Sequence, residues 1–129
     1  MRIYVTPGAL VRRISRDAAT SALRQQLHEA WWVGDLLATS ELTRLELTRF
    51  ATRYGVNRTV VHDALAGIEF VPPSSAVLAM AAEIGGPSLD IVSAVHVASA
   101  KTIEAEVALG YDEPMTAAMA AEGIALRTP

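Results

Sequence analysis

The chain has 129 residues, a formal net charge of −3 and no cysteine. This length predicts one domain over residues 1–129, and the lack of cysteine excludes disulfides, thiolate metal ligands and cysteine nucleophiles. Hydrophobic residues make up 51% of the chain, which excludes a disordered protein, while no apolar run approaches the roughly 18 residues of a membrane span. Pro7 and Gly8 interrupt the first apolar stretch, so we expect no signal peptide. We therefore expect a globular, cytoplasmic protein with no membrane partner.

The first half of the chain predicts strands that alternate with helices. Apolar spacing and turn residues predict, in order, a strand at 2–6, helices at 9–14 and 17–30, a strand at 33–39, helices at 40–55 and 57–68, and a strand at 69–71. Ser40 and Asn57 are suitable N-caps for the helices at 40–55 and 57–68, and Asp17 is suitable for the helix at 17–30.

The second half continues the alternation. It predicts a helix from 74 or 75 to 84, a long buried helix that ends near Leu109, a short strand near 110–111, a helix at 113–122 and a strand at 124–126. Such alternation is typical of an α/β protein with a mainly parallel central sheet and helices on both faces. Binding sites in such sheets form beyond the C-terminal ends of the strands.

The segment from Ile91 to Ala100 contains only three polar side chains, those of Ser93, His96 and Ser99. A helix that is apolar all round lies inside a domain rather than on its surface. We expect His96 to be a core histidine, hydrogen-bonded to a backbone carbonyl, rather than a metal ligand.

Four segments resemble, in order, the motifs of the PIN-domain ribonucleases of the VapC toxin type. Residues 3–11 (IYVTPGALV) resemble IYLDTSALV, and residues 39–47 (TSELTRLEL) resemble TSxLxRVEL. Residues 92–100 (VSAVHVASA) resemble LDAIHLATA, and residues 111–115 (YDEPM) resemble TYDRRL. The resemblance spans nearly the whole chain and implies a PIN-like three-layer α/β sandwich.

This resemblance also implies a site. The four acidic positions of the family fall on Thr6, Glu46, Ser93 and Asp112 in this chain. In the family, carboxylates hold Mg²⁺ or Mn²⁺, which activates water and neutralises charge developing on an RNA phosphodiester. Glu46 and Asp112 are therefore the expected catalytic and metal-binding residues, and Thr6 and Ser93 are substituted acid positions.

Other groups are candidates to complete the metal shell. Asp90 lies one helical turn before Ser93 and is expected on the same face. The hydroxyls of Thr6 and Ser93 are weaker oxygen ligands, and Glu41 or Glu113 are further carboxylates near the motifs.

Two functional interpretations follow from the resemblance, and an unrelated α/β binding domain is a third alternative. Replacing two of four acids lowers the formal charge of the site from about −4 to about −2, which weakens its attraction for a cation. The protein is then either a Mg²⁺-dependent endoribonuclease or a non-catalytic pseudo-PIN interaction protein that binds an antitoxin or RNA. Taken alone, Glu46 also suits a simple ion pair with Arg49 or Arg53 at the next turns of its helix.

The resemblance implies partners as well. A VapC-like toxin homologue is expected to form a homodimer, to be neutralised by a VapB-type antitoxin, and to bind RNA if it is active. Such antitoxins often present an arginine to the acidic pocket, which Glu46 and Asp112 would receive bidentately.

Overall fold

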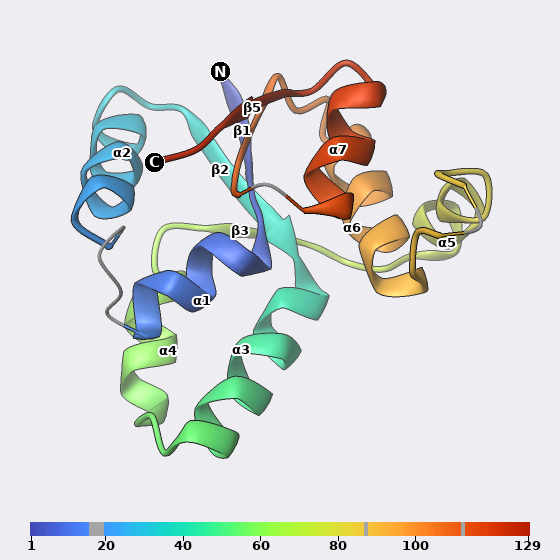
Figure 1. The fold of residues 1–129 in the computed structure, drawn as a ribbon. Coiled ribbons are helices and arrows are strands. Elements are labelled where there is room, and N and C mark those ends of the chain that lie inside the picture. The colour runs from blue at the N-terminus through green and yellow to red at the C-terminus, as the bar shows by residue number, and fades with distance from the viewer. Residues whose placement is uncertain (16–19, 87, 112) are drawn as a thin grey trace.

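A computed structural model of the chain describes residues 1–15, 20–86, 88–111 and 113–129 (Figure 1). Its centre is a five-stranded sheet with the strand order β3-β2-β1-β4-β5. The strands are β1 (Arg2–Val5), β2 (Leu36–Ser40), β3 (Glu69–Val71), β4 (Val107–Leu109) and β5 (Ala125–Arg127). Every neighbouring pair is parallel, which confirms the predicted α/β fold class.

Helices cover both faces of this sheet, as Figure 1 shows. The first group comprises α1 (Pro7–Ser15), α2 (Thr20–Trp32), α3 (Glu41–Tyr54) and α4 (Arg58–Leu65), and the second comprises α5 (Ser75–Ala81), α6 (Ile91–Thr102) and α7 (Pro114–Ala121). Successive strand residues point to opposite faces, so Ile3 and Val5 pack with the first group, whereas Tyr4 packs with the second. Among the described residues, none of the helices is both long and apolar enough to cross a bilayer.

Local signals in the sequence explain several helix ends. The side chains of Ser40 and Asn57 accept hydrogen bonds from backbone N–H groups at the starts of α3 and α4, at 3.1 and 2.9 Å, as predicted for N-caps. Gly55 ends α3 in the left-handed conformation, at φ 68°, which glycine adopts without steric cost. The predicted N-cap Asp17 lies outside the described residues.

The predicted buried helix is confirmed, but its predicted end is wrong. The eight residues from Ser93 to Ala100 are all buried. The helix ends at Thr102 rather than near Leu109, and Glu104 then takes a positive φ of 55°. The apolar residues Val107–Leu109 form the strand β4 between β1 and β5, and this strand replaces the one predicted at 110–111. A buried parallel strand and a buried helix both appear as continuous apolar runs, so apolar content could not separate them.

Candidate acidic site

The site lies at the C-terminal ends of β1 and β4, where the strand order reverses. The chain proceeds from β1 to β2 and β3 on one side and places β4 and β5 on the other; such a switch point is where open α/β sheets bind ligands. The N–H of Thr6 donates to the carbonyl of Leu109 at 3.0 Å. A Cβ atom on Gly110 would lie 2.6 Å from Thr6 Oγ1, so glycine permits this close approach of the two strand ends.

A hydrogen-bonded chain of side chains runs from the sheet to the site. The N–H of Ser40 donates to Tyr4 Oη at 3.0 Å, Tyr4 Oη lies 2.6 Å from His96 Nδ1, and His96 Nε2 lies 2.6 Å from Glu46 Oε1. Tyr4 and His96 are fully buried, whereas the Glu46 side chain is 35% exposed. This chain joins β1, α6 and α3, which are far apart in the sequence.

Two expectations about these residues are wrong. His96 bonds to a phenol and a carboxylate rather than to a backbone carbonyl, because Tyr4 points from β1 toward α6. Among the described residues, the hydrogen-bond partner of Glu46 is His96, not Arg49 or Arg53, because α6 offers a buried donor on that flank of α3.

Glu113 supplies a second carboxylate at the site. It precedes α7, and a Cβ atom on Gly8 would lie 2.9 Å from Glu113 Oε1, so its carboxylate covers the start of α1. Burial raises the pKa of Glu113, the Arg12 guanidinium opposes that rise, and the charge of Glu46 adds to it. The two carboxylates therefore share one electrostatic environment.

The substituted acid positions carry hydroxyls that are held locally. Thr6 is buried, and its Oγ1 accepts a hydrogen bond from the Ala9 N–H at 3.3 Å. Ser93 donates to Asp90 twice, from its hydroxyl to Oδ2 at 3.0 Å and from its N–H to Oδ1 at 2.7 Å.

Three other predicted residues have different outcomes. Asp90 is the N-cap of α6, and its hydrogen bonds from Ser93 lower its pKa, so both oxygens are engaged in capping rather than extended toward Glu46. Glu41 pairs with Arg44 at 3.0 Å on the exposed side of α3. Asp112 lies outside the described residues.

The donor chemistry of this site fits a hard divalent cation. Magnesium is usually held through one or two carboxylates together with water and substrate phosphate, and Glu46 and Glu113 supply two such groups. No cluster of three or more His, Asp or Glu suited to a metal occurs in the described part of the chain, so a fully protein-built cage is not present there.

Sequence reasoning missed Tyr4 and underrated His96 and Glu113. A signal for Tyr4 was available, since strand alternation places it on the face opposite Ile3 and Val5, toward the buried helix that carries His96. No comparable local pattern indicates that Glu113, rather than Glu41, turns toward Glu46.

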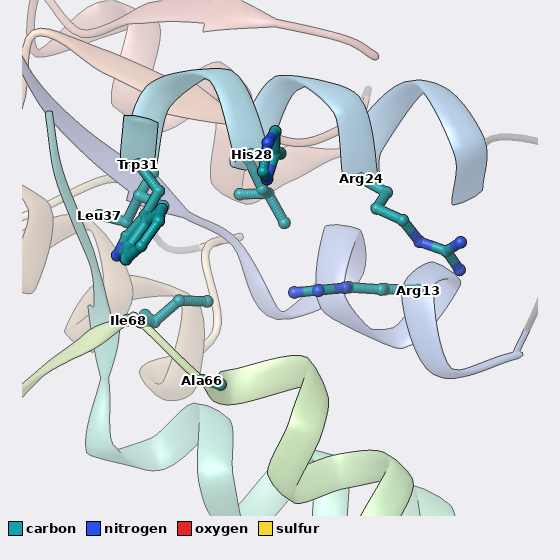
Figure 2. Close-up of a pocket in the computed structure, with 9 residues that line it drawn as sticks. Arg13, Arg24, His28, Trp31, Leu37, Ala66 and Ile68 are labelled. Atoms are coloured by element: carbon teal, nitrogen blue, oxygen red, sulfur yellow. The ribbon is translucent and has the colours of Figure 1, made fainter. Parts of the chain in front are cut away.

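A separate cavity of about 430 Å³ lies between α2 and the ends of α1 and α4. Figure 2 shows Arg13 reaching beneath His28 into the space that Trp31 and Ile68 border. Arg13 Nη1 donates to the carbonyl of Ala64 at 2.7 Å, and burial together with the nearby charge of Arg24 lowers the pKa of Arg13. This cavity is apolar with cationic groups.

The parallel sheet and the acidic site at its switch point define an α/β protein of the kind that binds ligands beyond its strand ends. Residues 8–118 match the family model of the PIN domain. The chain belongs to the PIN-domain family.

Individual relatives agree with this assignment. The chain is 29% identical over 131 residues to Ribonuclease VapC47 of Mycobacterium tuberculosis (strain CDC 1551 / Oshkosh), covering 98% of this chain and 96% of that protein. Its fold is similar to VapBC2 from Rickettsia felis, solved bound to a promoter DNA fragment, with TM-score 0.81, 12% identity and coverage of 99% and 98%. It is also similar to Mycobacterium tuberculosis VapC20, described as a Sarcin-Ricin loop cleaving toxin, with TM-score 0.67, 16% identity and coverage of 90% and 94%.

The raised pKa of Glu113 predicts a pH-dependent stability. A carboxyl whose pKa is higher in the folded state stabilises the fold while it is protonated and loses that contribution as the pH rises through its unfolded and then its folded pKa. Glu113→Gln should therefore raise the melting temperature relative to wild type at pH 7 in EDTA. This gain should shrink at a pH below the ordinary pKa of glutamate.

The matched control is Glu69→Gln, an exposed carboxylate on β3. The difference in melting temperature between this variant and wild type should be nearly the same at pH 7 and at acid pH. A Glu113→Gln gain that is equal at both pH values would contradict the assignment of a raised pKa.

Proposed function

We propose that the protein is a VapC-type ribonuclease that hydrolyses RNA phosphodiester bonds with Mg²⁺ or Mn²⁺. The observation that carries this proposal is the placement of two carboxylates, Glu46 and Glu113, in one electrostatic environment at the switch point of a PIN fold. We further propose that residues 1–129 form one PIN-like domain that acts as a homodimer in the cytoplasm.

In this proposal Glu46 and Glu113 hold the cation, and Asp112 is a third ligand by its place in the motif. The cation, when bound, activates water and neutralises charge that develops on the phosphodiester. Two other contacts act through position. His96 holds one oxygen of Glu46, and the close approach of Thr6 to Gly110 keeps the ends of β1 and β4 together.

A second candidate function is a pseudo-PIN interaction protein that binds an antitoxin or RNA without cleaving it. The observation that favours it is the absence of charge at Thr6 and Ser93, whose hydroxyls already have local hydrogen-bond partners. Those partners reduce the gain from turning either hydroxyl toward a metal.

Calorimetric titration with Mn²⁺ separates these two functions. The ribonuclease interpretation predicts binding at sub-millimolar concentration, and Glu46→Gln should weaken it at least about tenfold because the variant loses one of two anionic ligands. Glu41→Gln, on the same helix but paired with Arg44 on the surface, should bind as wild type does. A flat trace for the wild type would favour the interaction protein.

Restoring the family acids provides a second test. Thr6→Asp combined with Ser93→Asp should lower the stability of the metal-free protein by about 1–3 kcal/mol, because poorly compensated charges are then buried beside Glu46. The same variant should bind Mn²⁺ more tightly than wild type.

Thr6→Asn with Ser93→Asn is the control, since it makes nearly the same change in shape without charge. If the aspartate variant unfolds at the wild-type temperature and binds no more Mn²⁺ than the asparagine variant, then positions 6 and 93 do not face the cation.

We also propose that a VapB-type antitoxin binds and inhibits the protein. The solved structures of VapBC2 and FitAB support a two-component system. FitAB was solved bound to an IR36 DNA fragment, and its fold is similar to this chain with TM-score 0.66, 18% identity and coverage of 100% and 95%. The cavity of Figure 2 supports a protein partner, because its apolar walls and the cationic Arg13 and Arg24 suit a segment that carries apolar and acidic side chains.

A VapB-type antitoxin encoded beside this gene should therefore co-purify with the protein when the two are expressed together. Arg24→Ala should weaken the complex by about two- to fivefold, as expected for a partly exposed ion pair, and added salt should reduce this difference. Arg53→Ala, an exposed arginine on α3, should not weaken it. Equal losses for both variants would place the antitoxin elsewhere.

A further inference from the structure

The first link of the hydrogen-bonded chain that ends at Glu46 has a direction that its donor determines. The N–H of Ser40 carries a single hydrogen, and it points to Tyr4 Oη at 3.0 Å. Burial raises the pKa of Tyr4, so the phenol keeps its own hydrogen. This hydrogen can be donated to His96 Nδ1, which lies 2.6 Å from Tyr4 Oη.

This direction determines the form of the imidazole. When Nδ1 accepts from Tyr4, the ring hydrogen of neutral histidine lies on Nε2. His96 Nε2 then donates to Glu46 Oε1 at 2.6 Å. The rings of Tyr4 and His96 meet edge-on, with centroids 6.1 Å apart and planes inclined by 70°, which suits a hydroxyl directed at the edge of the imidazole.

The opposite arrangement fits the surroundings less well. A protonated His96 would direct an Nδ1 hydrogen at Tyr4 Oη, which would then accept two hydrogen bonds and turn its own hydrogen away.

We infer that His96 is a positioning residue, held by Tyr4 with its hydrogen on Nε2, that fixes one oxygen of Glu46 and would leave the other available to the proposed cation. This inference rests on the proposed metal-dependent function. A histidine that orients a ligand in this way typically changes metal affinity by ten- to a hundredfold when it is disrupted. Tyr4 thus acts on the site through two hydrogen bonds, without contact with the cation or the substrate.

The position of Ser40 links Tyr4 to the helix that carries Glu46. Ser40 is the N-cap of α3, so the residue that orients Tyr4 also begins the helix that carries Glu46. The contacts close a loop from α3 through β1 and α6 and back to α3. A shift of any one of these elements would break a buried hydrogen bond.

Two measurements test the inference, and one does not need a metal. The ¹⁵N signals of the imidazoles at neutral pH should show His96 as the neutral Nε2–H form, with His28 and His62 as references in the same molecule. An Nδ1–H form or an imidazolium at position 96 would overturn the inference.

The second measurement is Mn²⁺ affinity by paramagnetic resonance titration. Tyr4→Phe should weaken binding about tenfold, whereas Tyr54→Phe, at the exposed end of α3, should not change it. His96→Gln, whose amide N–H can replace the Nε2 donor, should stay within a few-fold of wild type, while His96→Ala should not. Melting temperatures identify any variant that fails to fold.

The outcomes separate this inference from the proposed function. If wild type binds Mn²⁺ and Tyr4→Phe binds it equally well, the positioning role is overturned while the ribonuclease proposal stands. If wild type binds no Mn²⁺, the metal-dependent function fails, and the ¹⁵N spectrum alone then supports or overturns the assigned form of His96.

Discussion

The structure depends on one buried polar chain, from the Ser40 N–H through Tyr4 and His96 to Glu46. Each group in it would carry a desolvation cost of about 1–3 kcal/mol if its partner were missing, so the chain is favourable only when β1, α3 and α6 all lie in place. Apolar packing in the two layers brings these elements together without fixing their positions finely. The hydrogen bonds supply that finer constraint. They end at the Glu46 carboxylate, which is the partly exposed member of this hydrogen-bonded series.

A second constraint comes from the close approach of β1 and β4 at the switch point. The space that a side chain at Gly110 would fill is taken by Thr6, so the strand ends meet with almost no room between them. Glu46 lies on α3, and Glu113 lies just before α7 with its carboxylate against Gly8. Burial is the main cause of the raised pKa of Glu113, and the charge of Glu46 adds to it.

The sequence predicted the order and type of most elements, because strand patterns, capping residues and motif order agree with one another. It failed where the answer lies in distant contacts. His96 is hydrogen-bonded to Tyr4, which lies 92 positions away in the sequence, and no local pattern encodes that partner. Asp90 lies beside Ser93, as expected, but its Oδ1 caps α6 and its Oδ2 accepts the Ser93 hydroxyl, because Ser93 sits at the third position of that helix. The end of α6 depended on a positive φ at Glu104, which a non-glycine residue rarely adopts.

The substitutions at Thr6 and Ser93 remove charge without removing the contacts that hold the site in shape. Thr6 satisfies an N–H at the start of α1, and Ser93 satisfies Asp90, so both positions keep a structural use. The chain through His96 is different, because a buried polar network is seldom more stabilising than well-packed apolar residues of similar volume. Stability alone therefore does not account for Tyr4 and His96, whereas orientation of the Glu46 carboxylate does. This contrast favours the proposed metal-dependent function, in which the lost charges reduce cation affinity while the Glu46 carboxylate is still held in one orientation.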